Sequence, residues 1–248
     1  MGGPQSLGLH EPSARLALLD GCAIWLEGRA LRIPLGSQRL LALLALHDHP
    51  LQRIFVAGTL WGNHSDQRSI ANLRTAMARL PRAAGSLLDV AGRQLSLAGW
   101  VSVDVRETSE LARQVIDRNQ EVLAIKGIHR RLMSDLLPDW FEDWVQAEQQ
   151  RYRELRLHAL EALCEGLTDR HEFGAAIEAG IAAVAAEPLR ESAQRVLIRA
   201  YLAEGNRAAA VFQYRRFDSL LQRELGLAPS AALRSLVSFA GEARAVPG

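Results

Sequence analysis

The stretch from Ser65 to Leu80 carries the pattern that most restricts how this chain can fold. Its apolar side chains recur three or four residues apart, at Ile70, Leu73, Met77 and Leu80. This spacing predicts one apolar face of an α-helix. Ser65 or Asp66 can cap the start of that helix, and Pro81 ends it.

Polar side chains of the same stretch predict a second, opposite face. Arg68, Asn72, Thr75 and Arg79 are spaced four, three and four residues apart, which aligns them along the helix. In a DNA major groove, asparagine can bind adenine with two hydrogen bonds and arginine can bind guanine in the same way. An ordinary core helix with a solvated face shows the same pattern, so the neighbouring elements must decide between the two interpretations.

Three short apolar runs precede this helix, at Arg15–Leu19, Cys22–Leu26 and Leu31–Leu35. Asp20-Gly21 and Glu27-Gly28 separate them, and such dipeptides between apolar runs are strong hairpin signals. A small antiparallel sheet is therefore expected at this end of the chain.

Two further helices are expected between the sheet and Ser65. Ser37 is predicted to cap the first, Gln38 to His47, whose dense leucine run indicates burial on most sides. The second covers Ile54 to Trp61. Gln52, which precedes it, is not a good capping residue. The residues Gly62, Asn63, His64 and Ser65 then turn the chain into the arginine-bearing helix.

A second hairpin is expected after Pro81, from Leu87–Val90 and Gln94–Leu97, with Trp100–Val105 extending from it. A sheet, three helices and a hairpin follow one another in a winged helix-turn-helix, whose third helix enters the major groove. Arg93 lies at the expected hairpin tip, where it is either a phosphate contact or an ordinary exposed turn residue. Because Pro81 ends the helix early, Arg79 and Arg82 are expected to supply its last phosphate contacts.

Beyond Asp104 the pattern is helical and contains a repeat. Helices are expected at Glu107–Asp117, Asn119–Met133, Phe141–Leu167, Phe173–Ala186, Arg190–Ala203, Ala208–Leu225 and Ser230–Ala240. The segment His171–Ile177 recurs 34 residues later as Gly205–Val211. Ala159 and Leu163 recur in the same way as Ala193 and Leu197. This period is that of tetratricopeptide (TPR) repeats, which stack helix pairs around a concave surface.

The expected fold is mainly α with a small β component: an N-terminal winged helix-turn-helix followed by an all-α TPR-like helical domain. The predicted divisions are a flexible tail at 1–13, domains at 14–105 and 106–240, and a flexible tail at 241–248. Residues 1–103 hold ten arginines and six acidic residues, a charge of +4, whereas residues 104–248 hold 19 basic and 22 acidic residues, a charge of −3. This mild asymmetry suits a DNA-facing part joined to a protein-facing part.

Composition also indicates the compartment. No window resembles a membrane span or a secretory signal, so we expect a cytoplasmic protein without membrane association. Cys22 and Cys164 lie far apart within apolar patterns, and are expected to be reduced and buried. We also considered a metal site at His47, His49 and His64, and favour polar residues at helix ends because no carboxylate or cysteine stands at ligand spacing.

Several motifs resemble known families. One group resembles the bacterial transcriptional activator domain: Leu136–Val145, Leu155–Leu163, Ala186–Ala193, Tyr201–Asn206 and Arg223–Ser230. A second group is similar to the winged helix of antibiotic regulatory proteins of the SARP type: Gln38–Ala42, Val56–Trp61 and Ala71–Arg74. The resemblance implies a transcriptional activator that binds promoter-proximal direct repeats of double-stranded DNA as a side-by-side pair and contacts RNA polymerase. It also implies that the Asp66–Leu80 helix reads DNA and that the Gly62–Ser65 turn faces the polymerase.

Two other classes of function are alternatives to a DNA-binding regulator. A protein-interaction adaptor with weakened DNA binding would also suit the acidic C-terminal half. An enzyme would need an activated nucleophile or a paired acid and base, and the scattered histidines offer no such arrangement. We therefore expect a regulator without catalytic activity, cofactor or metal.

Overall fold

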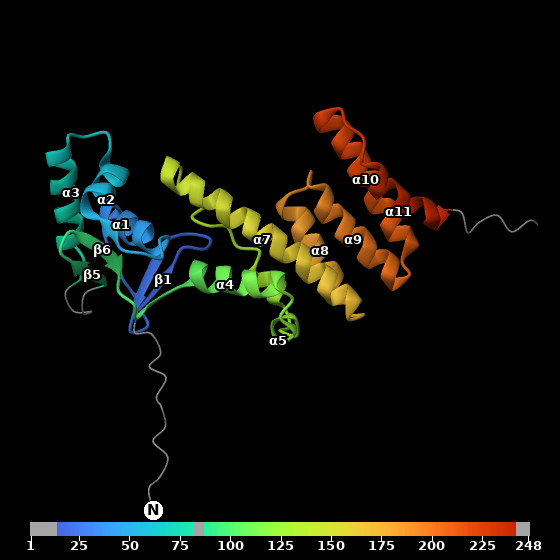
Figure 1. The fold of residues 1–248 in the computed structure, drawn as a ribbon, viewed down its shortest axis with the longest axis horizontal. Coiled ribbons are helices and arrows are strands. Elements are labelled where there is room, and N and C mark those ends of the chain that lie inside the picture. Colours follow the sequence, from blue (N-terminus) through green and yellow to red (C-terminus); the bar gives the residue numbers. More distant parts are fainter. Residues whose placement is uncertain (1–13, 82–86, 242–248) are drawn as a thin grey trace, which may run out of the picture. The chain divides into compact units, whose positions relative to one another are not determined.

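The computed structural model of the chain (Figure 1) describes residues 14–81 and 87–241. It contains two compact units, which are described one at a time. The first unit is Met1–Glu107 with Asp135–Gln150, and the second is Thr108–Ser134 with Arg151–Gly248. The segment 135–150, which the predicted boundary at residue 105 assigns to the helical domain, thus belongs to the first unit.

The first unit opens with a four-stranded sheet in the order β3-β2-β1-β7. Its strands are β1 (Ala14–Ala17), β2 (Ala23–Leu26), β3 (Arg29–Ala30) and β7 (Val101–Val103). The two expected hairpins are present, and Glu27 and Gly28 both have positive φ, as the two-residue turn between β2 and β3 requires. The expected third run at Leu31–Leu35 is wrong, because β3 ends at Ala30 and a helix begins at Leu35.

A further correction concerns the segment after the second hairpin. Trp100–Val105 was expected to extend that hairpin, but β7 instead pairs in parallel with β1, with Ala14 opposite Val101. This pairing joins two segments that lie more than 80 residues apart in the sequence. The carboxylate of Asp104 then accepts hydrogen bonds from the backbone N–H groups of Leu18 and Leu19, at 2.8 and 3.1 Å.

Three helices follow β3 in the chain: α1 (Leu35–Ala45), α2 (Arg53–Trp61) and α3 (Asp66–Ala78). The leucine run of α1 is buried on most sides, as expected, since Leu40, Leu41, Leu43 and Leu44 are at most 1% exposed. Ser37 is not the cap of α1. It lies within the helix, because Pro34 has the extended backbone of the capping position.

The second sheet holds the hairpin expected after α3. Its strands are β4 (Leu51–Gln52), β5 (Leu88–Ala91) and β6 (Gln94–Leu97), in the order β4-β6-β5. Three helices between a sheet and a hairpin form a winged helix-turn-helix, as predicted.

The second unit is helical. Two of its helices, α4 (Asp104–Ile116) and α7 (Asp143–Asp169), begin within the residue ranges of the first unit. The helix expected at Asn119–Met133 is wrong, because Gly127 has a φ of +72° and divides it into α5 (Gln120–Leu123) and α6 (Ile128–Arg131). The remaining helices are α8 (Phe173–Ala186), α9 (Glu191–Glu204), α10 (Arg207–Leu225) and α11 (Ala231–Gly241).

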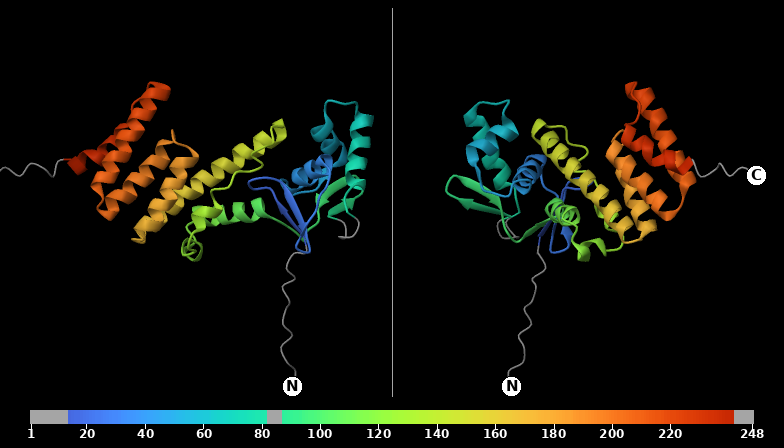
Figure 2. Two further views of the ribbon diagram at one scale, coloured as in Figure 1. Left: turned by 180° about the vertical axis from the view of Figure 1, so that it is seen from behind. Right: turned by 45° about the vertical axis from the view of Figure 1, so that its right-hand side comes forward.

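The 34-residue repeat is visible in the packing. Its equivalent residues are buried alike: Ala159 and Ala193, Leu163 and Leu197, and Ala176 and Ala210 are each at most 1% exposed. His171 and Gly205, also 34 residues apart, both have left-handed backbone, with φ of 61° and 89°. Both views of Figure 2 show α8 to α11 (orange to red) stacked side by side. The helical unit is therefore TPR-like.

Candidate nucleic-acid interface

The position of α3 is set by hydroxyl groups as well as by apolar packing. Buried Ser69 donates a hydrogen bond to the carbonyl oxygen of Trp61 at 2.8 Å, which ties α3 to the end of α2. Buried Ser37 of α1 donates another to the carbonyl oxygen of Ala76, also at 2.8 Å. Leu73 between them is 2% exposed. These contacts fix the rotation of α3 about its axis.

The buried side of α3 consists of Ser69, Leu73 and Ala76. Of the apolar residues expected to form that face, only Leu73 is fully buried, and Ile70, Met77 and Leu80 are half-buried at its edge. The small side chains of Ser69 and Ala76 take the centre because they allow the close approach that their hydrogen bonds require. The helix is therefore rotated from the orientation that its largest apolar residues suggest.

This rotation changes which polar side chains face outward. Arg68, Thr75 and Arg79 are exposed, as expected, whereas Asn72 is half-buried beside the buried row. Opposite that row lie Gln67, Ala71, Arg74 and Ala78, all exposed and spaced four, three and four residues apart.

Gln67 and Arg74 were not predicted as site residues. The prediction placed the outer face opposite the large apolar side chains. The centre of the buried face instead consists of small residues on either side of Leu73, which an apolar pattern does not indicate. The signal that could have revealed it is the spacing of Ser69, Leu73 and Ala76, which form a small-residue row.

The remaining predicted residues of α3 lie near its end. Thr75 is exposed and its hydroxyl donates to the carbonyl oxygen of Ala71 at 3.0 Å, which leaves its methyl group and oxygen lone pairs to face outward. Arg79 occupies the C-cap position. Arg82 lies outside the described residues.

The hairpin of β5 and β6 places Arg93 at its tip, where the side chain is exposed. Gly92 before it has a φ of +58°, which suits a tight turn. The carbonyl oxygen of Arg93 accepts a hydrogen bond from the backbone N–H of Arg53 at 2.8 Å. The turn is thus anchored through its backbone to the start of α2.

The loop between α2 and α3 is exposed at all four predicted positions, Gly62, Asn63, His64 and Ser65. Ser65 has the extended backbone of an N-cap, although its side chain forms no capping hydrogen bond. The loop is held at one end by the backbone N–H of His64, which donates to the carbonyl oxygen of Trp61 at 3.1 Å.

Four exposed arginines lie in this part of the first unit: Arg68 and Arg74 on α3, Arg79 at its C-cap, and Arg93 at the hairpin tip. Within residues 14–81 and 87–241, no carboxylate forms an ion pair with any of them. Such arginines can bind phosphate and base-edge acceptors without first giving up an internal partner.

The second half of the chain decides the family. Residues 103–238 match the family model described as "Bacterial transcriptional activator domain". The chain belongs to this family. The SARP-type resemblance noted from the motifs is thereby confirmed, and this family consists of transcriptional regulators rather than enzymes.

Two similar proteins extend the comparison. Regulatory protein AfsR of Streptomyces coelicolor is 28% identical over 245 residues, covering 90% of this chain and 24% of AfsR, so the chain spans about a quarter of that relative. A solved structure of Mycobacterium tuberculosis EmbR, in complex with a low-affinity phosphopeptide, has a TM-score of 0.70 and is 20% identical. It covers 91% of this chain, which spans 64% of the EmbR chain, and supports the fold assignment.

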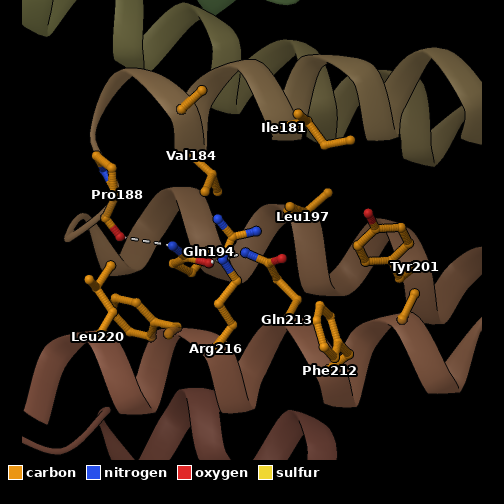
Figure 3. A pocket seen from close by; sticks show the side chains of 13 residues that line it. Ile181, Val184, Pro188, Gln194, Leu197, Tyr201, Phe212, Gln213, Arg216 and Leu220 are labelled. Atoms are coloured by element: carbon orange, nitrogen blue, oxygen red, sulfur yellow. Dashed lines mark hydrogen bonds between the residues drawn. The ribbon is translucent and has the colours of Figure 1, made fainter.

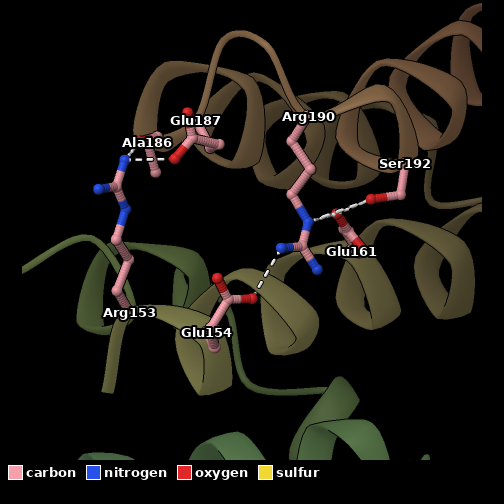
Figure 4. Close-up of polar contacts among 7 residues, drawn as sticks. All are labelled: Arg153, Glu154, Glu161, Ala186, Glu187, Arg190 and Ser192. Carbon is pink, nitrogen blue, oxygen red and sulfur yellow. Dashed lines mark hydrogen bonds and ion pairs between the residues drawn. The ribbon is translucent and has the colours of Figure 1, made fainter. Parts of the chain in front are cut away.

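One family motif of this bacterial transcriptional activator domain protein, Ala186–Ala193, forms a charged joint between helices (Figure 4). The Arg190 guanidinium donates to Glu161 and Glu154 of α7 at 2.7 and 2.8 Å. Burial lowers the pKa of Arg190, but the hydrogen bonds and charges of Glu154 and Glu161 raise it more, so that the net pKa lies above its ordinary value. The motif thus serves the packing of the helical unit.

The two cysteines and the histidine at the end of α1 lie in surroundings typical of structural residues. Cys22 is half-buried and Cys164 buried, and both are free thiols. Burial, followed by the charges of Asp104 and Glu165 respectively, raises their pKa values to about 11 and about 12, which keeps both thiols protonated at neutral pH. His47 Nδ1 lies 2.8 Å from the carbonyl oxygen of Leu43, as expected of a residue at a helix end. Across the described ranges, no three His, Cys, Asp or Glu side chains gather into a group that could hold a metal ion.

Among residues 14–81 and 87–241, no helix combines the length and the apolar character needed to cross a bilayer.

Proposed function

We propose that this chain is a sequence-specific DNA-binding transcriptional activator. The observation that carries the proposal is the cationic outer face of α3, held rigidly on a winged helix by Ser37 and Ser69. In winged helices of this type the third helix enters the major groove. Gln67, Arg68, Arg74 and Thr75 then face base edges, and Arg79 faces phosphates. Asn72 is half-buried and contacts DNA at the edge of this face.

The hairpin and the loop have separate roles in this proposal. Arg93 at the hairpin tip contacts the DNA backbone, and Arg82 adds a phosphate contact beyond the end of α3. The exposed Gly62–Ser65 loop faces RNA polymerase. Two copies bind side by side on direct repeats near a promoter, as the family resemblance implies.

The test begins with selection of a binding site from random double-stranded DNA by the full chain. Fluorescence anisotropy at fixed salt then measures affinity for that site. Arg68→Ala and Arg74→Ala are each expected to weaken binding by about 1–3 kcal/mol, with relaxed preference at one base position. Arg29→Ala removes another exposed arginine, from β3, and serves as the matched control. Affinity unchanged in both α3 variants would exclude this face as the reading surface.

The polymerase contact needs a different measurement. His64→Ala is expected to leave DNA affinity unchanged and to lower transcription from the selected site in a purified system. An equal loss of DNA affinity and transcription would contradict a polymerase contact. If the wild-type chain selects no DNA at all and retains a protein partner, the adaptor function is the better description.

A further inference from the structure

The helical unit contains a pocket between α8, α9 and α10 (Figure 3). Its volume is about 380 Å³, within the range of roughly 300–1,000 Å³ that is usual for small-molecule sites. Val184, Leu197 and Leu220 give it an apolar lining. Phe212 and Ile181, also on its lining, are 68% and 49% exposed.

Two buried glutamines form a chain of hydrogen bonds at the pocket. The side-chain amide of Gln194 lies 2.9 Å from the carbonyl oxygen of Pro188. Because that backbone oxygen can only accept, the group facing it must be the Nε2–H donor of Gln194. Its Oε1 must therefore accept, and it does so from Nε2 of Gln213 at 2.7 Å. This sequence of donors fixes the orientation of both amides.

The consequence is a fixed acceptor at the pocket. Since Nε2 of Gln213 is held by Gln194, the Oε1 atom of Gln213 is the end of the chain and is left to accept from another donor. Gln213 is 9% exposed and lines the pocket, so a donor inside the pocket can meet this oxygen.

A cation stands beside this acceptor. Arg216 lies three residues after Gln213 on α10, and both side chains line the pocket. Figure 3 shows Arg216 extending from α10 toward Gln194 and Gln213. In the part of the chain that the structure describes, no carboxylate lies within ion-pair distance of Arg216.

Tyr201 adds a hydroxyl to the lining. Burial, with the charge of Glu204 as the smaller cause, raises the pKa of Tyr201 above its ordinary value. The phenol hydroxyl can donate a hydrogen bond to a bound molecule.

We propose that this pocket binds a small organic acid with an apolar body and a hydroxyl or amide donor close to its carboxylate. The carboxylate pairs with Arg216, and the donor binds Oε1 of Gln213. The apolar body lies against Val184, Leu197 and Leu220, and Phe212 and Ile181 cover the part that projects outward. This site is separate from the surface proposed to bind DNA, and its test does not depend on DNA binding.

The test uses the full chain, titrated with 3-hydroxydecanoate in a calorimeter at concentrations below micelle formation. Decanoate lacks the donor for Gln213, and 1,3-decanediol lacks the charge for Arg216. Each is expected to bind about tenfold more weakly or worse, which is the effect of one lost hydrogen bond to a charged or buried group. Equal affinity for all three compounds, or no binding of 3-hydroxydecanoate up to its solubility limit, would overturn the proposal.

Variants locate the site. Arg216→Gln is expected to weaken binding of 3-hydroxydecanoate at least tenfold, whereas Arg215→Gln, an exposed neighbour on α10 outside the pocket lining, leaves it unchanged. Ala209→Phe places a large side chain in the pocket and should abolish binding. Circular dichroism confirms that each variant is folded. Undiminished binding in folded Arg216→Gln or in folded Ala209→Phe would show that the acid binds elsewhere.

Discussion

The hydroxyl of Ser37 donates a hydrogen bond at 2.8 Å to the carbonyl oxygen of Ala76, 39 residues away in the sequence. The last four carbonyl groups of a helix lack partners within it. At the end of α3, the oxygens of Thr75 and Met77 accept from the backbone N–H groups of Arg79 and Leu80. Ser37 satisfies the oxygen of Ala76 that lies between them, and so joins α1 to α3.

Replacement of Ser37 should therefore destabilise the first unit. Ser37→Ala leaves a buried carbonyl oxygen unpaired and is expected to lower the free energy of unfolding by about 1–3 kcal/mol, measured by urea denaturation. Ser102→Ala is the control, because its hydroxyl reaches the oxygen of Ala14 only at 3.5 Å. Equal losses in the two variants would argue that the Ser37 contact has no special role.

The hairpin tip is expected to contribute charge without sequence preference. Arg93→Ala should weaken binding uniformly across DNA sequences and reduce the slope of log affinity against log salt by about 1. Arg93→Lys should retain most of the slope, since a phosphate contact needs chiefly a positive charge. A salt titration that gives the wild-type slope for Arg93→Ala would rule out the contact.

The charged joint of the helical unit offers a stability prediction. Arg190→Ala removes hydrogen bonds to Glu154 and Glu161, and leaves two partly buried carboxylates close together. The free energy of unfolding is expected to fall by about 1–3 kcal/mol. Arg223→Ala, which removes an exposed pair with the adjacent Glu224, should change it by less than about 0.5 kcal/mol. Thermal melts of both variants, compared with wild type, decide the point.

Two glycines of α8 should respond oppositely to the same substitution. A Cβ atom at Gly180 would lie 3.1 Å from Cys164 Sγ and from Cβ of Leu197, whereas one at Gly174 would meet nothing within 4 Å. Gly180→Ala is therefore expected to destabilise by about 1–3 kcal/mol through overpacking. Gly174→Ala should be neutral or stabilise by up to about 1 kcal/mol, because alanine favours the helix. A stabilised Gly180→Ala would mean that α8 and α9 can separate at little cost.

Much of the fold could be predicted because its signals are local. The hairpins follow from Glu27-Gly28 and from Ala91-Gly92-Arg93, and α8 spans Phe173–Ala186 as its periodicity indicates. The 34-residue repeat could also be predicted, because each helix pair packs against the next through residues at the same repeat positions. The helix expected at Asn119–Met133 failed because Gly127 adopts left-handed backbone, which a hydrophobic pattern does not reveal.

The candidate site was predicted only in part. Arg68, Thr75, Arg79 and Arg93 are exposed where expected, and the turn Gly62–Ser65 is exposed as well. Their roles on DNA and polymerase remain predictions. The outward position of Gln67 and Arg74 was not predicted, because the rotation of α3 depends on partners outside its own sequence.

The amino-acid sequence by itself determined most of the helices, the hairpins, their order, and the family to which that order and those motifs belong. These properties depend on side-chain periodicity and turn residues within a few positions of one another. Only the tertiary structure decided which side of α3 faces outward, that β7 pairs with β1, and that residues 135–150 belong to the first unit. Each of these depends on contacts between distant segments, such as the hydroxyl of Ser37 and the oxygen of Ala76, whose geometry exists only once the chain has folded.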